Sequence, residues 1–138
     1  MLESAAAARY AQVRDVTSTP GELLLALYDG LFRFLNGAKA CIENKQLPRA
    51  RELLSKAHAI LSELTIALDH TVAPELCGQL EGLYGFCIDR VQVASRKVDV
   101  VAIEEVTRVL TPLREAWAIA VPRAVQEAHA AANANHRP

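Results

Sequence analysis

The stretch that decides the fold is residues 18–35, which reads STPGELLLALYDGLFRFL. It joins a clear helix start to a dense apolar face. Thr19, Pro20 and Glu22 fit a capping box with proline at the first helical position, where its missing N–H has no intrahelical partner. Apolar residues then recur at helical spacing. The pattern predicts a long helix from Thr19 to about Asn44.

The same plan, a start signal followed by an apolar stripe, is repeated three times downstream. The second predicted helix starts near Leu47 and ends before Asp69, and the third starts near Pro74. The predicted core face of the third helix comprises Leu76, Leu80, Leu83, Tyr84, Cys87, Val91 and Ala94. Three helix start signals, each followed by apolar residues at helical spacing, indicate three further long helices. The last of them begins at an N-cap, Asp99.

The last predicted helix contains two prolines, Pro112 and Pro122. Proline removes a backbone donor and clashes with the preceding turn, so we expect a kink at Pro112 and an end or bend at Pro122. Residues 123–132 would form one more helical piece, and 133–138 a loose tail. Trp117 falls on the apolar stripe of this helix and is predicted to be a core residue.

Short connections between long helices force antiparallel neighbours. The sequence therefore predicts an all-α fold, an antiparallel up-down four-helix bundle with a short N-terminal helical arm at residues 1–17. Residues 1–138 would form a single domain, because 138 residues suffice for one core. The composition agrees: 51% of the residues are hydrophobic and only 5% aromatic, which favours aliphatic packing of helices.

Several function classes are disfavoured by composition and motifs. Fifteen basic and sixteen acidic residues nearly cancel without a basic run, so we expect no nucleic-acid partner. No apolar segment could span a membrane and no secretory signal precedes the first helix, which predicts a cytosolic protein without stable membrane insertion. The scattered histidines, the odd cysteine count and the absence of phosphate-loop or nucleophile motifs predict no metal, no cofactor and no enzymatic activity.

Surfaces outside the core are then the place to look for function. Gly82 and Gly85 lie near Phe86 and Val93 in the third helix, where glycine is costly unless a backbone or a partner approaches. Either they admit neighbouring helices of the bundle, or they form a shallow groove for an added helix. Ile66 lies outside the core stripe of the second helix and could widen such a groove.

The N-terminal arm is the second candidate surface. Tyr10, Val13 and Val16 could share one face of a helix too short to be stable alone. Such an arm either caps the bundle or is displaced by a partner. The predicted partner-binding residues are thus Tyr10, Val13, Val16, Ile66, Gly82, Gly85, Phe86 and Val93, and the sequence names no catalytic residues.

The chain resembles the FliS family of flagellar export chaperones from about Tyr10 to about Trp117. The matching motifs, in order, are the arm tyrosine at Tyr10, VTSTPGEL at 16–23, LYDG at 27–30, KAHAILSEL at 56–64, Leu80 with Leu83-Tyr84, Arg90 and Ala94, and LREAW at 113–117. The chain departs from the family pattern at Ser18, Gln79, Gly85, Ser95 and Pro112. Most of these departures fall on the third helix.

The resemblance implies a bundle that binds the C-terminal segment of flagellin in the cytosol. It would prevent premature polymerisation and aid delivery to the flagellar export apparatus. The alternative, from another class, is a non-catalytic adaptor or regulatory bundle for a different helical partner or secretion system. A weak homodimer also remains open at this point.

Overall fold

The structure, a computed structural model, describes residues 20–135 and is entirely helical over that range apart from short connections. The helices are α2 (Pro20–Glu43), α3 (Leu47–Ile66), α4 (Pro74–Lys97) and α5 (Val100–Asn135). The chain falls into two compact units, which among the described residues comprise 27–113 and, separately, 20–26 with 114–135. Each unit is described by itself.

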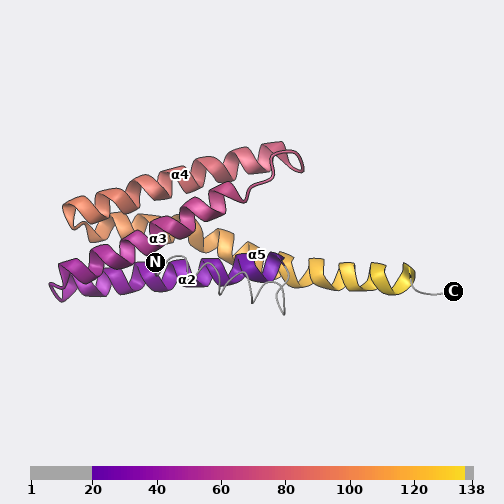
Figure 1. Cartoon of the computed structure of the whole chain (residues 1–138), viewed down its shortest axis with the longest axis horizontal. Helices are drawn as coiled ribbons and strands as arrows, with labels where there is room; N and C mark the ends of the chain where they lie inside the picture. Colours follow the sequence, from indigo (N-terminus) through magenta and orange to yellow (C-terminus); the bar gives the residue numbers. More distant parts are fainter. Residues whose placement is uncertain (1–19, 136–138) are drawn as a thin grey trace, which may run out of the picture. The chain divides into compact units, whose positions relative to one another are not determined.

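The unit 27–113 is the four-helix bundle. Successive helices run in opposite directions (Figure 1), because the connections 44–46, 67–73 and 98–99 are too short for anything else. The prediction of an antiparallel up-down four-helix bundle is therefore confirmed. Aliphatic side chains from all four helices fill the core, and the largest fully buried ones include Leu31, Leu54, Leu61, Ile103 and Leu110.

Side-chain contacts outside the core show which helices of the bundle are neighbours. The Lys56 ammonium lies 5.7 Å from the centre of the Phe34 ring, which joins α3 to α2. Side-chain contacts join the remaining pairs: Arg51 to the Ser95 carbonyl (α3 and α4), Arg90 to Glu105 (α4 and α5), and Lys39 to Glu104 (α2 and α5). The helices thus form a closed square, although exposed ion pairs such as these each add little stability.

One polar contact crosses the core diagonally. The hydroxyls of Tyr28 on α2 and Tyr84 on α4 lie 2.6 Å apart in the buried interior. Burial and the hydrogen bond with Tyr28 raise the pKa of Tyr84. Because both partners are polar and buried, this contact fixes the register of α2 against α4 more specifically than leucine packing can.

Two of the connections place a non-glycine residue in the left-handed region. Lys45 has φ 60° and Val98 has φ 54°. After α2, the Gln46 N–H donates to the Cys41 carbonyl at 2.8 Å, and after α4 the Asp99 N–H donates to the Ala94 carbonyl at 3.2 Å. Both are helix C-terminal turns of the Schellman kind, which usually carry glycine.

The start of α5 confirms the predicted N-cap at Asp99, whereas its C-terminal part differs from the predictions for the residues after Pro122. The Asp99 carboxylate accepts the Val101 N–H at 2.9 Å, as an N-cap should. We expected an end or a bend at Pro122; the helix continues through it to Asn135, which rules out an end there. Residues 123–132 belong to the same helix, and Asn133–Asn135, expected in a loose tail, are helical.

The second unit packs the first turns of α2 against the C-terminal half of α5. A Cβ atom built on Gly21 would lie 2.8 Å from Cγ1 of Val121, so glycine is needed for this close approach. Val121 is buried, but Trp117, predicted to be a core residue, is only half-buried. Thr19, the predicted N-cap of α2, lies outside the described residues.

Candidate partner-binding surface

The surface that stands out in the bundle is the outer face of α4. Leu76, Leu83 and Phe86 are exposed by 48%, 37% and 44%. At 3.6 residues per turn, Leu76, Leu83 and Phe86 fall on one stripe with half-buried Val93, beside the core stripe of the same helix. The prediction that Leu76 and Leu83 face the core is therefore wrong: the buried stripe is narrower than the apolar pattern of the sequence.

The glycines of α4 line the same outer side. A Cβ atom built on Gly78, Gly82 or Gly85 would meet no atom of the described part of the chain within 4 Å. They therefore do not serve close packing within the bundle, which was one of the two readings left open. By contrast, a Cβ on Gly37 of α2 would lie 3.1 Å from Cδ1 of Leu53 on α3, so that glycine does admit a neighbouring helix.

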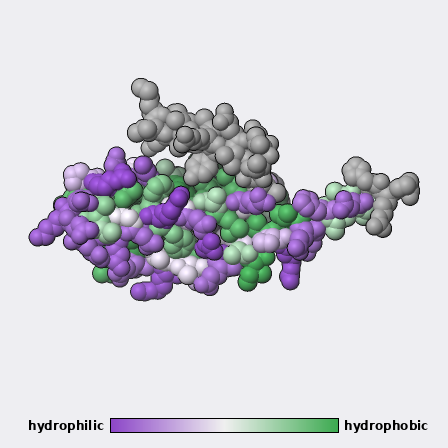
Figure 2. Space-filling view, turned by 90° about the horizontal axis from the view of Figure 1, so that it is seen from below, coloured by the Kyte–Doolittle hydropathy of each residue, from purple (hydrophilic) through white to green (hydrophobic). Residues whose placement is uncertain are grey.

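Exposed apolar residues continue around the α3–α4 connection. Ile66, the last residue of α3, is 85% exposed, and Val72 in the connection is 79% exposed. Together with the first turn of α4 they bring three apolar side chains to one end of the helix pair. The opposite side of the molecule, seen in Figure 2, also carries apolar surface between charged residues, so exposed apolar area is not confined to α4.

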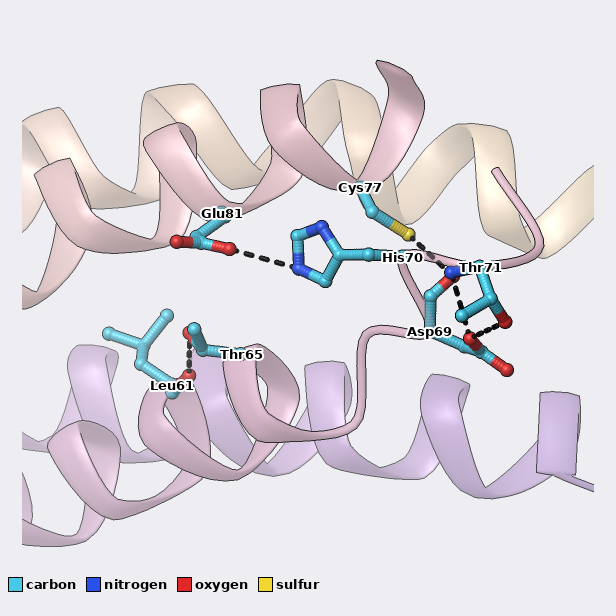
Figure 3. Close-up of polar contacts among 7 residues, drawn as sticks. All are labelled: Leu61, Thr65, Asp69, His70, Thr71, Cys77 and Glu81. Carbon is cyan, nitrogen blue, oxygen red and sulfur yellow. Dashed lines mark hydrogen bonds and ion pairs between the residues drawn. The ribbon is translucent and has the colours of Figure 1, made fainter. Parts of the chain in front are cut away.

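Local hydrogen bonds hold this connection in shape (Figure 3). The Asp69 carboxylate accepts hydrogen bonds from the backbone N–H and the hydroxyl of Thr71, and these bonds lower the pKa of Asp69. The Cys77 thiol donates to the Asp69 carbonyl at 3.3 Å. Nε2 of His70 lies 3.0 Å from Oε2 of Glu81, a contact between the connection and α4. Val72 is thus exposed on an ordered turn, where the side chain has less freedom to lose on binding.

The predicted partner-binding residues fall into two groups in the structure. Phe86 and Gly82 are exposed on the outer side of α4, Gly85 and Val93 are half-buried there, and Ile66 lies at the end of α3. Tyr10, Val13 and Val16 lie outside the described residues, and their role stays a prediction. We define the outer strip as the exposed apolar residues Ile66, Val72, Leu76, Leu83 and Phe86 together with the α4 glycines.

Sequence reasoning missed three residues of the outer strip. The apolar pattern predicts Leu76 and Leu83 in the core, and it makes no prediction for Val72. A signal for the first two existed, because a helix with apolar residues around more than half of its circumference cannot bury all of them in a bundle. Nothing in the sequence around Val72 distinguishes an exposed loop valine from a buried one.

The thiols differ in environment. Cys77 and Cys87 are buried, Cys41 is half-buried, and all three are free. Burial raises the pKa of the Cys87 thiol to about 11. A thiol with that pKa stays protonated near neutral pH and is a poor nucleophile. Among the described helices, none is both long enough and apolar enough to cross a membrane.

Comparisons with known proteins agree with this architecture. The family model described as flagellar protein FliS matches residues 2–124. The flagellar secretion chaperone FliS of Bacillus subtilis is 34% identical over 120 residues, covering 87% of this chain and 89% of the relative. The protein of the same name in Salmonella typhimurium is 33% identical and covers 83% and 89%.

A solved structure supports the fold independently. The crystal structure of a flagellar chaperone from bacteria superposes with a TM-score of 0.71 at 24% identity, covering 88% of this chain and 98% of that one. At that identity the similarity supports the fold, while the family assignment rests on the sequence matches. The chain belongs to the FliS family of flagellar secretion chaperones.

Proposed function

We propose that this protein binds the C-terminal segment of flagellin in the cytosol, prevents its premature polymerisation and aids its delivery to the flagellar export apparatus. Membership in a family whose relatives are named flagellar secretion chaperones supports the class of function. The observation that carries the binding role is the outer strip, an apolar face of α4 that the bundle leaves uncovered.

The outer strip has the features of a helix-binding surface. Leu76, Leu83 and Phe86 recur along about three turns, so they can meet apolar residues at helical spacing on a partner. The α4 glycines add no side chain between these anchors and the partner, which allows a partner helix to approach the α4 backbone closely. A segment of flagellin that becomes helical on binding would fit this surface.

The chemistry of the surface suits a chaperone that must release its client. Apolar contacts need no covalent step, and ordering a disordered segment offsets part of the binding free energy, which keeps a large interface reversible. We accordingly propose that the protein is not an enzyme and acts by holding and releasing its partner. Tyr10, Val13 and Val16 would form the exchangeable part of the interface, since they precede α2 on an arm too short to be stable alone.

The test is calorimetric titration of the full chain with a peptide of the flagellin C-terminal segment. We expect saturable binding, weakened about tenfold or more by Phe86→Ala, because truncating an aromatic anchor typically costs more than 1 kcal/mol of binding free energy. Ile119→Ala is the matched control, since Ile119 is 70% exposed but lies on the other unit. The absence of saturable binding at micromolar concentrations would refute the proposal.

A further inference from the structure

The end of the bundle at the α3–α4 connection carries apolar side chains that a helix lying along α4 does not need. Among the large apolar residues exposed in the described part of the chain, Ile66 and Val72 are the most exposed, at 85% and 79%. A single exposed apolar residue is ordinary on a protein surface, whereas a cluster of them marks an interaction site. We define the hairpin end as Ile66 and Val72 together with the exposed side chains of Glu63 and Glu75 beside them in the sequence.

Hydrogen bonds fix the shape of the hairpin end before any partner arrives. The Val72 N–H donates to the Asp69 carbonyl at 3.2 Å, which closes a turn directly at the exposed valine. The Cys77 thiol donates to the same carbonyl and ties the turn to α4 (Figure 3). Because the turn is already ordered, a partner that packs on Val72 has little backbone entropy to remove.

The charge around the hairpin end has one sign. Residues 57–89 contain no lysine or arginine, and all of their acidic residues are exposed: Glu63, Asp69, Glu75, Glu81 and Asp89. No lysine or arginine among the described residues forms an ion pair with any of them. The whole chain is nearly neutral, with 15 basic and 16 acidic residues, so this negative field is a local feature of the α3–α4 hairpin.

The sign of this field restricts the occupant. Anionic lipid head groups and nucleic-acid phosphates would be repelled, and so would the hairpin end of a second copy. Apolar anchors with an acidic border complement a segment that carries lysine or arginine beside its own apolar residues. We propose that the hairpin end binds a basic amphipathic helix of a second protein, distinct from the flagellin segment.

The placement of the anchors allows the two partners to bind separately. Leu83 and Phe86 lie along α4, where the proposed client helix packs. Ile66 and Val72 instead belong to the end of α3 and to the connection, before α4 begins. A helix that follows α4 can therefore leave the hairpin end free for another protein.

The experiment is calorimetric titration of the full chain with three synthetic helical peptides in about 0.1 M salt. The first peptide has a stripe of leucines bordered by lysines, the second has glutamate in place of each lysine, and the third has serine in place of each leucine. We expect saturable binding of the first at micromolar concentration. The second and third should bind about tenfold more weakly or worse, because the site needs both the positive charge and the apolar anchors.

Variants of the hairpin end test where the leucine–lysine peptide binds. Ile66→Ser and Val72→Ser should each weaken it about fivefold or more, and the exposure of both side chains means that the fold tolerates the changes. The double variant E63K/E75K should weaken this peptide about tenfold and strengthen binding of the glutamate peptide. Glu43→Lys is the matched control, because Glu43 is exposed at the opposite end of α3, about 30 Å of helix away, where salt screens the charge.

The outcomes decide the proposal whether or not the chain binds flagellin. It is overturned if the leucine–lysine peptide does not bind saturably, or if the glutamate peptide or the serine peptide binds equally well. Phe86→Ala should leave the affinity for the leucine–lysine peptide within about twofold of the parent value. If Phe86→Ala instead weakens this peptide as much as Val72→Ser does, the peptide occupies the α4 surface and a separate site is refuted.

Discussion

The two faces of α4 are both apolar, yet they differ in what they contact. On the inner face Leu80, Tyr84 and Cys87 are buried against the other helices of the bundle. On the outer face Leu83 and Phe86 are exposed, beside glycines that meet nothing in the described chain. The inner face stabilises the fold through burial, whereas the outer face keeps apolar area available, which monomeric surfaces rarely do in contiguous form.

The largest expected difference between the faces comes from two leucines one turn apart. Leu80 is 5% exposed and Leu83 is 37% exposed, so the same truncation removes very different amounts of packing. We expect Leu80→Ala to lower the free energy of unfolding by about 2–5 kcal/mol, and Leu83→Ala to lower it by about 1 kcal/mol or less. Urea denaturation measures both values.

For the affinity for the flagellin peptide we expect the reverse order, with Leu83→Ala having the larger effect and Leu80→Ala the smaller. Leu83→Ala is expected to weaken binding of the flagellin peptide, while Leu80→Ala, measured at a temperature where that variant is folded, leaves the affinity close to that of the parent chain. Equal losses of stability for the two variants would contradict the division of α4 into a structural face and a binding face.

A second prediction uses pH to probe the inner face. An unfolded thiol ionises near pH 8.5, whereas burial raises the pKa of Cys87 in the folded state to about 11. Between these values the unfolded chain loses a proton that the folded chain keeps, so the free energy of unfolding decreases as pH rises. The thiol accounts for about 2–3 kcal/mol over this interval, and the raised pKa of Tyr84 acts in the same direction.

The measurement is urea denaturation at pH values from 8 to 11, spaced by about one pH unit. Cys87→Ala should show a shallower decline, because it removes one of the two groups. Val91→Ala serves as the control: Val91 is equally buried, so the variant is destabilised at every pH but keeps the original slope. Identical slopes for Cys87→Ala and the parent chain would show that the thiol does not titrate as its burial implies.

The smallest expected change in the free energy of unfolding comes from a substitution on the outer face. This substitution stabilises the fold, whereas the leucine truncations destabilise it. Gly82→Ala adds a methyl group in open space within a helix, so it should raise the free energy of unfolding by about 0.5–1 kcal/mol. Gly37→Ala is the matched change inside the bundle, where Leu53 lies 3.1 Å from the added atom, and we expect it to give no such gain. Thermal denaturation distinguishes the two, and a destabilised Gly82→Ala would mean that an unseen contact occupies the strip.

The sequence was sufficient for the bundle because its local signals agree with one another. Pro74 and Asp99 mark helix starts through the chemistry of their own backbone and side chain, and the structure begins α4 and α5 where they indicate. Short connections then leave only an antiparallel arrangement. These features depend on neighbouring residues, which is why a single sequence reveals them.

The parts that escaped prediction depend on packing between distant residues. Local rules at Pro122 favour an end or a bend of the helix, and only the packing around it decides that α5 continues through this proline. Whether Leu76 and Leu83 are buried or exposed depends on the width of the buried stripe of α4. That width depends on how closely α3 and α5 approach α4. The close approach of Val121 to Gly21 joins the first turns of α2 to a distant segment of the sequence, a proximity that no local pattern encodes.

Cys87 also offers a way to follow how often the bundle opens. Its thiol is enclosed by the core and protonated near neutral pH, so a thiol-reactive label can reach it only during transient exposure of that core. In a chain with Cys41 and Cys77 replaced, the labelling rate would therefore report the opening frequency of the folded state, in the manner of amide hydrogen exchange. Comparing that rate with and without the flagellin peptide would show whether the proposed binding makes opening of the bundle rarer or more frequent.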